Sequence, residues 1–270
     1  MLVSPPPTWV PPRLTCFLAG SARTGSSYLA RLMKDTGQLG WPREFFNPRM
    51  LTENLIGGSS DLVSPRPPPG PDEVAWRCDL VRIVGQSGNG IASTKLFPDH
   101  LRWMAKGVHI AEWFPTFRFV HLSRDDKLRQ AISAAIAAET KVWQGLTDAT
   151  RPEPAFSAEK IDSLLRYILA GEAMWEAYFL RNRIAPLRLT YEELDLDPAS
   201  TLRRVASYLD VDLPPAPIDG GPYVRQRGAL TEEWRERYLA AVADLNLPDG
   251  LVPPARKKRR FRLWPFGQRR

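Results

Sequence analysis

The chain has 270 residues, of which 43% are hydrophobic and 25% are charged, a balance typical of one globular domain or of a domain with a small annex. Its net charge of +7 comes from one end, because residues 255–270 hold eight of the 37 basic residues and no acid, whereas 29 bases face 30 acids elsewhere. This distribution, the two cysteines and the lack of a long apolar stretch argue against a nucleic-acid-binding body, a disulfide framework and a transmembrane protein.

The first segments of the chain predict a lead-in, a strand, a loop and a helix. Residues 1–12 contain five prolines and are expected to be a disordered or extended lead-in, without the basic region and apolar core of a signal peptide. Residues 14–19 have the apolar run of a buried strand, and residues 26–36 have the spacing of an amphipathic helix that Gly37 closes.

The loop between that strand and that helix resembles a phosphate-binding loop without its lysine. Gly20 and Gly25 have the Walker A spacing, but position 26 is a serine, and Arg23 lies inside the loop. Such a turn points backbone N–H groups and a helix N-terminus at an anion. The missing lysine argues against ordinary ATP hydrolysis. The alternative is a tight strand-to-helix turn that binds nothing.

The segment after the first helix surrounds one carboxylate, Glu44, with aromatic rings and prolines. It is a plausible floor for a sugar or another polyhydroxyl acceptor, and its members are Trp41, Pro42, Arg43, Glu44, Phe45, Phe46 and Asn47. Partial burial is expected to raise the pKa of Glu44 and suit it to take a proton from a hydroxyl. In the alternative, the aromatic rings fill the core and Glu44 is solvated. Residues 57–72 follow as a long loop.

The remaining pattern alternates strands and helices. Strands are expected at 91–96, 117–122 and 186–190, and helices at 98–106, 126–142, 157–181, 198–209 and 231–243, with a proline- and glycine-rich connector at 212–222. This order predicts an α/β fold with a mainly parallel sheet flanked by helices. Ligands bind such sheets at the carboxyl ends of the strands.

Two of these strand ends carry basic residues. Arg124 follows the strand at 117–122, and Ser133 lies on the next helix on the same face as Gln130, so Arg124 and Ser133 are expected to grip a second anion. In the alternative, Arg124 pairs with Asp125 or Glu139. Lys95, near the end of the strand at 91–96, is expected either to neutralise a transferred group or to form a structural ion pair.

Together and in this order, these segments resemble the Stf0 family of sulfotransferases. The matching stretches are ARTGSSYL at 22–29, TGQLGWPREFF at 36–46, STKL at 93–96, LSRDDKLRQAIS at 122–133, RQR at 225–227 and EEWRER at 232–237. The resemblance covers roughly residues 14–240. It implies a P-loop-like sulfotransferase fold that uses 3′-phosphoadenosine-5′-phosphosulfate (PAPS), releases PAP and needs no metal.

The resemblance also implies roles for single residues. The loop around the 5′-phosphosulfate corresponds to Arg23, Thr24, Gly25, Ser26 and Ser27. Arg124 and Ser133 correspond to the pair that holds the 3′-phosphate, and Arg225 or Arg227 corresponds to the arginine that closes over the nucleotide. Glu44 matches the glutamate proposed as general base. The catalytic group is therefore expected to be Glu44, Arg23 and Lys95.

Several alternatives stay open. Trehalose-sulfating members are expected to have a polar residue just before the loop arginine, where this chain has Ala22, so the acceptor is trehalose, another carbohydrate or a glycolipid. A P-loop kinase or NTPase, or an inactive membrane-associated binding protein, are the competing functions.

The resemblance and the charge distribution together predict the organisation of the chain. We expect one sulfotransferase domain at 13–245 and a basic, aromatic tail at 246–270, which is either solvated or bound to an anionic membrane surface. We also expect a cytoplasmic location, at the inner face of the membrane if the tail binds there. The resemblance to the family implies a homodimer.

Overall fold

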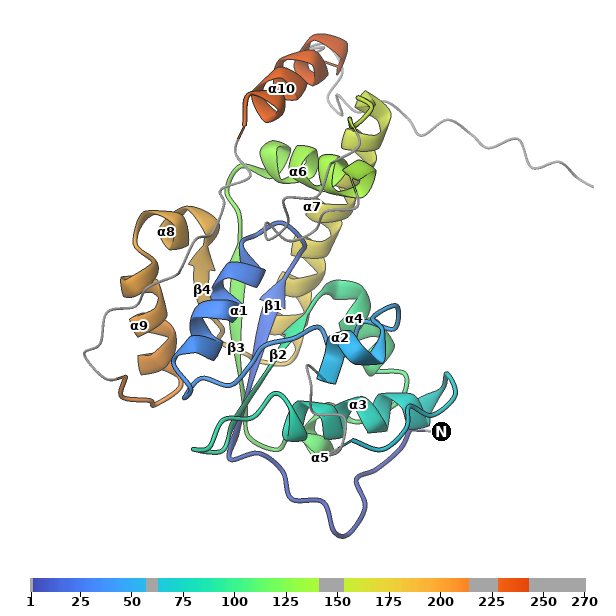
Figure 1. Ribbon diagram of the computed structural model, residues 1–270, viewed down its shortest axis with the longest axis vertical. Coiled ribbons are helices and arrows are strands. Elements are labelled where there is room, and N and C mark those ends of the chain that lie inside the picture. The colour runs from blue at the N-terminus through green and yellow to red at the C-terminus, as the bar shows by residue number, and fades with distance from the viewer. Residues whose placement is uncertain (1, 57–62, 141–152, 214–227, 243–270) are drawn as a thin grey trace, which may run out of the picture.

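The computed structural model describes residues 2–56, 63–140, 153–213 and 228–242 (Figure 1). Its centre is a sheet of four parallel strands in the order β2-β1-β3-β4. The strands are β1 (Leu14–Gly20), β2 (Ile91–Leu96), β3 (Phe117–Ser123) and β4 (Leu187–Thr190). Every residue of β1 and β2 is buried, as expected for parallel strands that are covered on both faces.

Ten helices in the described part of the chain surround this sheet. They are α1 (Ser26–Asp35), α2 (Thr52–Ile56), α3 (Pro71–Ile83), α4 (Pro98–Met104), α5 (Ile110–Trp113), α6 (Lys127–Thr140), α7 (Ala158–Arg181), α8 (Tyr191–Leu196), α9 (Pro198–Tyr208) and α10 (Ala229–Val242). Figure 1 shows α1, α8 and α9 on one side of the strands, with α3, α4 and α5 on the other and α10 above α6.

Alternate side chains of the strands fill two separate cores. Phe17 and Phe119 belong to the core with α3, α4, α5 and α7, whereas Leu18 and Val120 belong to the core with α1, α8 and α9. A third cluster joins α6, α7 and α10 around Trp234. The two covered faces leave the ends of the strands as the places where polar groups gather.

The expected fold class, a mainly parallel sheet flanked by helices, is confirmed. All four predicted strands are present within one residue of their expected bounds. Four helices were not predicted from the sequence: α2, α3, α5 and α8. The longest of them, α3, buries the charged residues Glu73 and Arg77 beside Val74 and Leu80, and this mixture hides the apolar spacing of a helix.

The lead-in before β1 packs against α5. The backbone of Val3 bridges Val108, and the Trp113 indole donates to the Val3 carbonyl at 2.9 Å. The Trp9 indole in turn donates to the Trp113 carbonyl at 3.1 Å, with the two rings edge to face. These indole contacts explain why a proline-rich segment follows a defined path here.

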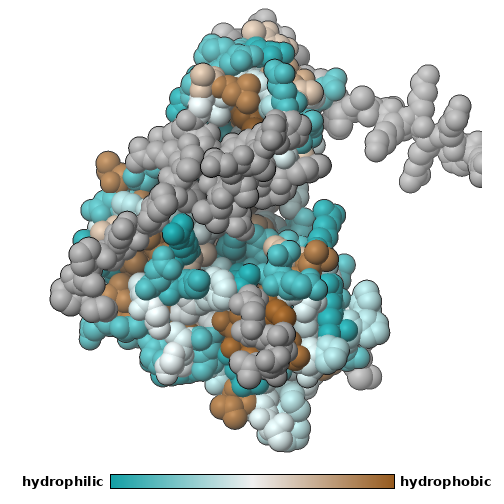
Figure 2. Space-filling model, viewed as in Figure 1, coloured by the Kyte–Doolittle hydropathy of each residue, from teal (hydrophilic) through white to brown (hydrophobic). Residues whose placement is uncertain are grey.

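The surface and the helices give no sign of a membrane span in the part of the chain that the structure describes. No helix there is both long and apolar enough to cross a bilayer. Where Figure 2 colours the surface, hydrophilic residues predominate and hydrophobic areas lie between them. The predicted tail at 246–270 lies outside the described residues.

Candidate active site

The loop between β1 and α1 requires glycine at two positions, Gly20 and Gly25. Gly25 has φ +80°, and a Cβ there would lie 2.9 Å from the ring of Tyr191. A Cβ at Gly20 would lie 2.4 Å from the carbonyl oxygen of Leu122 on β3. Arg23 also has a positive φ, +68°, which is uncommon for a residue with a side chain and occurs most often at functional turns.

The N-terminus of α1 adjoins this loop and has no side-chain cap. Its first turn contains no acid, and Gly25 at its N-cap position offers no side chain. The partial positive charge of the helix end is therefore available to an anion rather than cancelled within the helix. Whether the loop binds an anion stays a prediction from the sequence.

Side chains from α6 and α7 hold the loop from behind. Gln130 on α6 is fully buried and donates to the Ser21 hydroxyl at 2.9 Å and to the Ala22 carbonyl at 2.8 Å. On α7, the Trp175 indole donates to the Gly20 carbonyl at 3.0 Å. The sequence places Gln130 on the same helix face as Ser133, but it does not indicate that Gln130 and Trp175 hold the loop.

The residues expected to hold a second anion, Arg124 and Ser133, lie beside the loop. The Arg23 guanidinium donates through Nε to the Ser133 hydroxyl at 3.0 Å, and Arg124 Nη1 lies 3.4 Å from the Arg23 carbonyl oxygen. The Arg124 guanidinium lies over the Tyr191 ring at 4.6 Å from its centroid. The structure therefore brings together two arginines and a serine that are 110 residues apart at most. Glu139, an alternative partner of Arg124, forms an ion pair with Lys160.

Lys95 joins the loop to the predicted acceptor segment. Its ammonium lies 3.1 Å from Glu44 Oε1 and donates to the Ser27 hydroxyl at 3.2 Å. Lys95 is only 5% exposed. The Asn47 amide donates to the other carboxylate oxygen, Glu44 Oε2, at 2.9 Å. The carboxylate is therefore held by two donors beside the first turn of α1.

The pKa of Glu44 lies below its usual value, which corrects the expectation of a raised one. Burial is the largest influence and raises the pKa, but Lys95, Asn47 and the nearby His100 together lower it further than burial raises it. Glu44 is thus a carboxylate at neutral pH, and its donors, rather than solvent, stabilise this charged form.

His100 on α4 is an additional group near this carboxylate. Its ring is 7% exposed and stacks on Phe97, and its Nδ1 accepts from the Phe97 amide at 3.4 Å. Burial lowers the pKa of His100 to about 4, so the ring is neutral at pH 7. From the sequence, only the position of His100 five residues after Lys95 could have indicated that it lies near this site.

The predicted acceptor segment runs along the free edge of β2. Arg43 bridges Thr94, and the Lys95 amide donates to the Arg43 carbonyl at 2.8 Å. This pairing sets the direction of the next residue, Glu44. Trp41 lies beneath two cations, with Lys34 Nζ at 4.5 Å and Arg43 Cζ at 4.0 Å from its ring centroid.

Phe45 and Phe46 do not contribute to an acceptor floor in this structure. Both side chains are 0% exposed and belong to the core between the sheet and α3. The alternative stated for the aromatic rings, that they fill the core, holds for these two residues. Arg225 and Arg227, expected to close over a nucleotide, lie outside the described residues.

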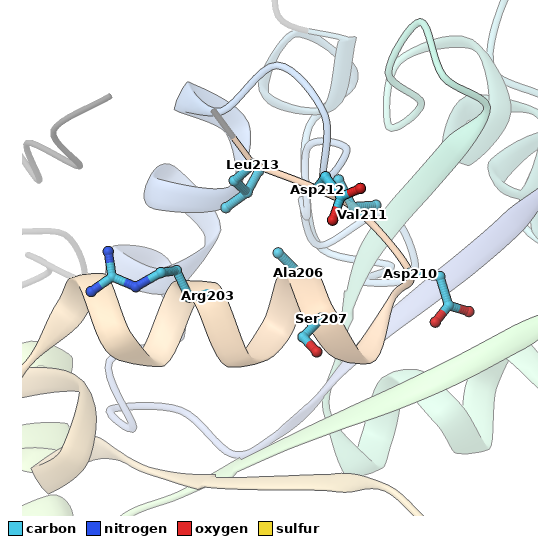
Figure 3. Close-up of a pocket in the computed structure, with 7 residues that line it drawn as sticks. All are labelled: Arg203, Ala206, Ser207, Asp210, Val211, Asp212 and Leu213. Atoms are coloured by element: carbon cyan, nitrogen blue, oxygen red, sulfur yellow. The ribbon is translucent and has the colours of Figure 1, made fainter. Parts of the chain in front are cut away.

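A pocket of about 480 Å³ lies elsewhere, beside the C-terminal end of α9 (Figure 3). Asp210 in its lining forms an ion pair with Arg118 at the beginning of β3. It therefore lies toward the amino ends of the strands, away from the loop at 21–25. Within the described residues, no group of three or more histidine, cysteine, aspartate or glutamate side chains is arranged to hold a metal ion.

Comparisons with known proteins agree with the resemblance. A sequence model of the family described as "Stf0 sulphotransferase" matches residues 16–241. The chain is 31% identical over 261 residues to a trehalose 2-sulfotransferase of Mycobacterium tuberculosis (strain Erdman), with 84% of this chain and 94% of the relative covered. It is 26% identical over 263 residues to a trehalose 2-sulfotransferase of Mycolicibacterium smegmatis, with 84% and 95% covered.

A solved structure of a sulfotransferase domain from the Synechococcus PCC 7002 olefin synthase is also similar. It is 15% identical, with a TM-score of 0.42, and covers 91% of this chain and 99% of its own.

Proposed function

Because the chain belongs to the Stf0 sulfotransferase family, we propose that it transfers a sulfuryl group from PAPS to a hydroxyl of a carbohydrate or glycolipid. The observation that carries this proposal is the position of Lys95, which binds both the anion-binding loop, at Ser27, and the carboxylate of Glu44. One buried ammonium thus connects the loop proposed to bind the sulfuryl donor with the carboxylate proposed to accept a proton. This arrangement suits transfer of an anionic group to a hydroxyl.

The donor side consists of the loop and the basic pair beside it. The residues that we assign to the 5′-phosphosulfate are Arg23, Thr24, Gly25, Ser26 and Ser27. Backbone N–H groups at the start of α1 bind such an anion without a lysine. We assign Arg124 and Ser133 to the 3′-phosphate, supported by their contacts with Arg23, and Arg225 or Arg227 to the closure over the nucleotide.

The acceptor side supplies the base. Glu44 takes the proton of the acceptor hydroxyl while that oxygen forms a bond to sulfur. The bond from sulfur to the bridging oxygen of the nucleotide breaks, and PAP leaves with the bonding electrons. Arg23 and the loop N–H groups stabilise the negative charge that grows on the bridging oxygen. Lys95 neutralises the sulfuryl oxygens from its place between Ser27 and Glu44.

The class of acceptor follows from the relatives, both of which are named for trehalose. Ala22 cannot donate or accept through its side chain, so a sugar in this site would be held by Glu44, Asn47 and Arg43 instead. We therefore propose a sugar hydroxyl in general, on a free carbohydrate or on a glycolipid. The tail beyond residue 245 would then bring the enzyme to a lipid surface.

Ligand-dependent melting tests the donor assignment. PAP without a divalent metal should raise the melting temperature of the full chain, because binding to the folded state stabilises it by mass action. ATP with magnesium should raise it less, since the loop lacks the lysine that reaches the β- and γ-phosphates. A larger shift with ATP and magnesium than with PAP would refute a PAPS-dependent enzyme and favour a kinase or NTPase.

A further inference from the structure

A buried carboxylate on α3 lies at the centre of a second charged cluster, outside the groups assigned to chemistry. Glu73 is 2% exposed, and its Oε1 accepts from Arg77 Nε at 3.0 Å and from Arg77 Nη2 at 2.8 Å. Arg77 is 0% exposed and lies one helical turn further along α3. Burial lowers the pKa of Arg77, while Glu73 raises it. Removal of one member of such a desolvated pair strongly destabilises the folded protein, because the other charge is left buried without a partner.

Arg77 uses its remaining nitrogen on the acceptor segment. Its Nη1 donates to the carbonyl oxygens of Phe45 and Asn47, the latter at 2.9 Å. The Asn47 amide side chain then donates to Glu44 Oε2, and its backbone N–H donates to the Glu44 carbonyl at 3.0 Å. A continuous chain of hydrogen bonds therefore leads from α3 to the proposed base.

Arg66 binds the same carboxylate oxygen of Glu73. Its Nε and Nη2 lie 3.0 and 2.6 Å from Glu73 Oε1. Its Nη1 donates to the Met50 carbonyl at 3.3 Å and its Nη2 to the Pro48 carbonyl at 3.1 Å. Two guanidiniums thus share one carboxylate oxygen and four backbone carbonyls between Phe45 and Met50.

Arg66 also belongs to a segment that the sequence marked only as a long loop. Residues 63–70 are held against α3 at a second point, where the Trp76 indole donates to the Ser64 carbonyl at 2.9 Å. This segment is therefore fixed beside the acceptor side of the site at two places. The Arg66 side chain is 27% exposed, so Arg66 is more accessible to solvent than Glu73.

We propose that Glu73, Arg77 and Arg66, named here the α3 clasp, are positioning residues that set the backbone of residues 45–50 and, through Asn47, the orientation of Glu44. Arg77 is the fixed half of the clasp. Arg66 makes residues 63–70 part of the support of the acceptor segment, so these residues contribute to turnover through the position of Glu44. The claim that the α3 clasp affects turnover rests on the proposed function of Glu44. The claim that it sets the backbone of residues 45–50 does not.

Arg66→Ala in the full chain is the test variant, because removal of the fully buried Arg77 risks loss of folding. Arg66→Lys keeps the positive charge but replaces the guanidinium with a single ammonium group. Arg82→Ala is the matched control. Arg82 lies on α3, the helix of Glu73 and Arg77, and pairs with Asp79, but both side chains are about 40% exposed.

Amide hydrogen exchange is the first readout, and it needs neither nucleotide nor acceptor. Exchange at Asn47 and Met50, whose amides are bonded to Glu44 and Asn47, should be faster in Arg66→Ala and partly restored in Arg66→Lys. Exchange at Leu29 in α1 should not change, and Arg82→Ala should match the wild type. Unchanged exchange at Asn47 and Met50 in Arg66→Ala would overturn the clasp.

Turnover of trehalose with PAPS is the second readout. In Arg66→Ala we expect kcat to fall by roughly 10- to 100-fold, the scale of a displacement of about 1 Å at a reacting group. The acid limb of the pH profile should move to higher pH, because a looser Asn47 no longer lowers the pKa of Glu44. PAP affinity should stay within about two-fold of the wild type.

The two readouts separate the two claims. A wild-type protein that binds no PAP would refute the proposed function, and hydrogen exchange would still decide the geometric claim. A wild-type protein that sulfates trehalose, with an Arg66→Ala variant of unchanged kcat and acid limb, would refute the positioning role alone. If trehalose is not sulfated, the exchange measurement decides.

Discussion

The ammonium of Lys95 lies 3.1 Å from Glu44 Oε1, and both side chains are largely buried, with exposed fractions of 6% and 18%. A buried ion pair loses hydration, so it persists only when further hydrogen bonds satisfy its members. Ser27 and Asn47 supply those bonds here. Glu44 and Lys95 therefore act as one unit, and a change in one alters the charge state of the other.

Lys95→Met tests this coupling. The methionine keeps the length of the side chain but removes the charge, which is the largest influence lowering the pKa of Glu44. The carboxyl pKa should rise, so activity should be lost at a higher pH as the solution is acidified. The pH profile of kcat measures this shift, and Lys106→Met, at an exposed lysine, is the control. An acid limb that does not move in Lys95→Met would contradict the coupling.

Arg124→Ala should weaken PAP binding by about 1.5–3 kcal/mol, the scale of a hydrogen bond to a charged group. Titration calorimetry without metal measures the affinity. Arg129→Ala is a suitable control, because Arg129 lies in the same stretch but pairs with Asp126 and with Glu232 on α10. Equal losses in the two variants would mean that general positive charge, rather than a site at Arg124, binds the nucleotide.

Folding stability should fall as the pH is lowered from 6.5 to 4. Two of the three histidines, His100 and His121, are buried, and burial lowers the pKa of each to about 4. Between the unfolded value near 6.5 and the folded value, the unfolded chain binds more protons, so stability present above pH 6.5 is lost on acidification. Each of these histidines, neutral in the folded chain and protonated in the unfolded one, lowers the free energy of unfolding by roughly 3 kcal/mol over this range.

Urea unfolding at pH 7, 5.5 and 4.5 measures this slope. His121→Phe should flatten it, because the phenyl ring does not titrate, whereas His109→Asn, at an exposed position, should leave it unchanged. A slope that is the same in His121→Phe and in the wild type would show that other groups control acid unfolding.

Deletion of residues 255–270 should leave sulfation of a soluble acceptor intact, since this tail carries eight basic residues and no acid and lacks the spacing of a core element. Binding to vesicles of anionic lipid should fall, and the loss should shrink at high salt because the attraction is screened. Equal binding by full-length and truncated protein would leave the tail as a solvated terminus.

The fold was largely predictable because its signals are local. The apolar runs of β1, β2 and β3 and the glycines of the loop are properties of short segments, and their order indicates a parallel sheet. The sequence paired Ser133 with Arg124 and did not predict its contact with Arg23, although it placed all three residues in segments at the carboxyl ends of parallel strands, which meet at one edge.

What the sequence could not show depends on contacts between distant segments. The lowered pKa of Glu44 requires Lys95, 51 positions away in the chain, to lie within hydrogen-bond distance. Burial alone predicts the opposite shift. Likewise, the sequence did not predict the helix that carries Glu73 and Arg77. Only the packing of α3 against the acceptor segment shows that the pair is buried and bound to backbone carbonyls.

Transfer of labelled sulfate from PAPS to a panel of free sugars and glycolipids, compared between the wild type and Glu44→Gln, tests the central claim most directly. Glutamine keeps the shape of the side chain but cannot take the hydroxyl proton, so kcat should fall by roughly 10²–10⁴-fold with PAP affinity nearly unchanged. Arg23→Ala should instead reduce both binding and turnover. Wild-type rates of sulfate transfer by Glu44→Gln, or no labelled sugar or glycolipid from a wild type that binds PAP, would contradict the account.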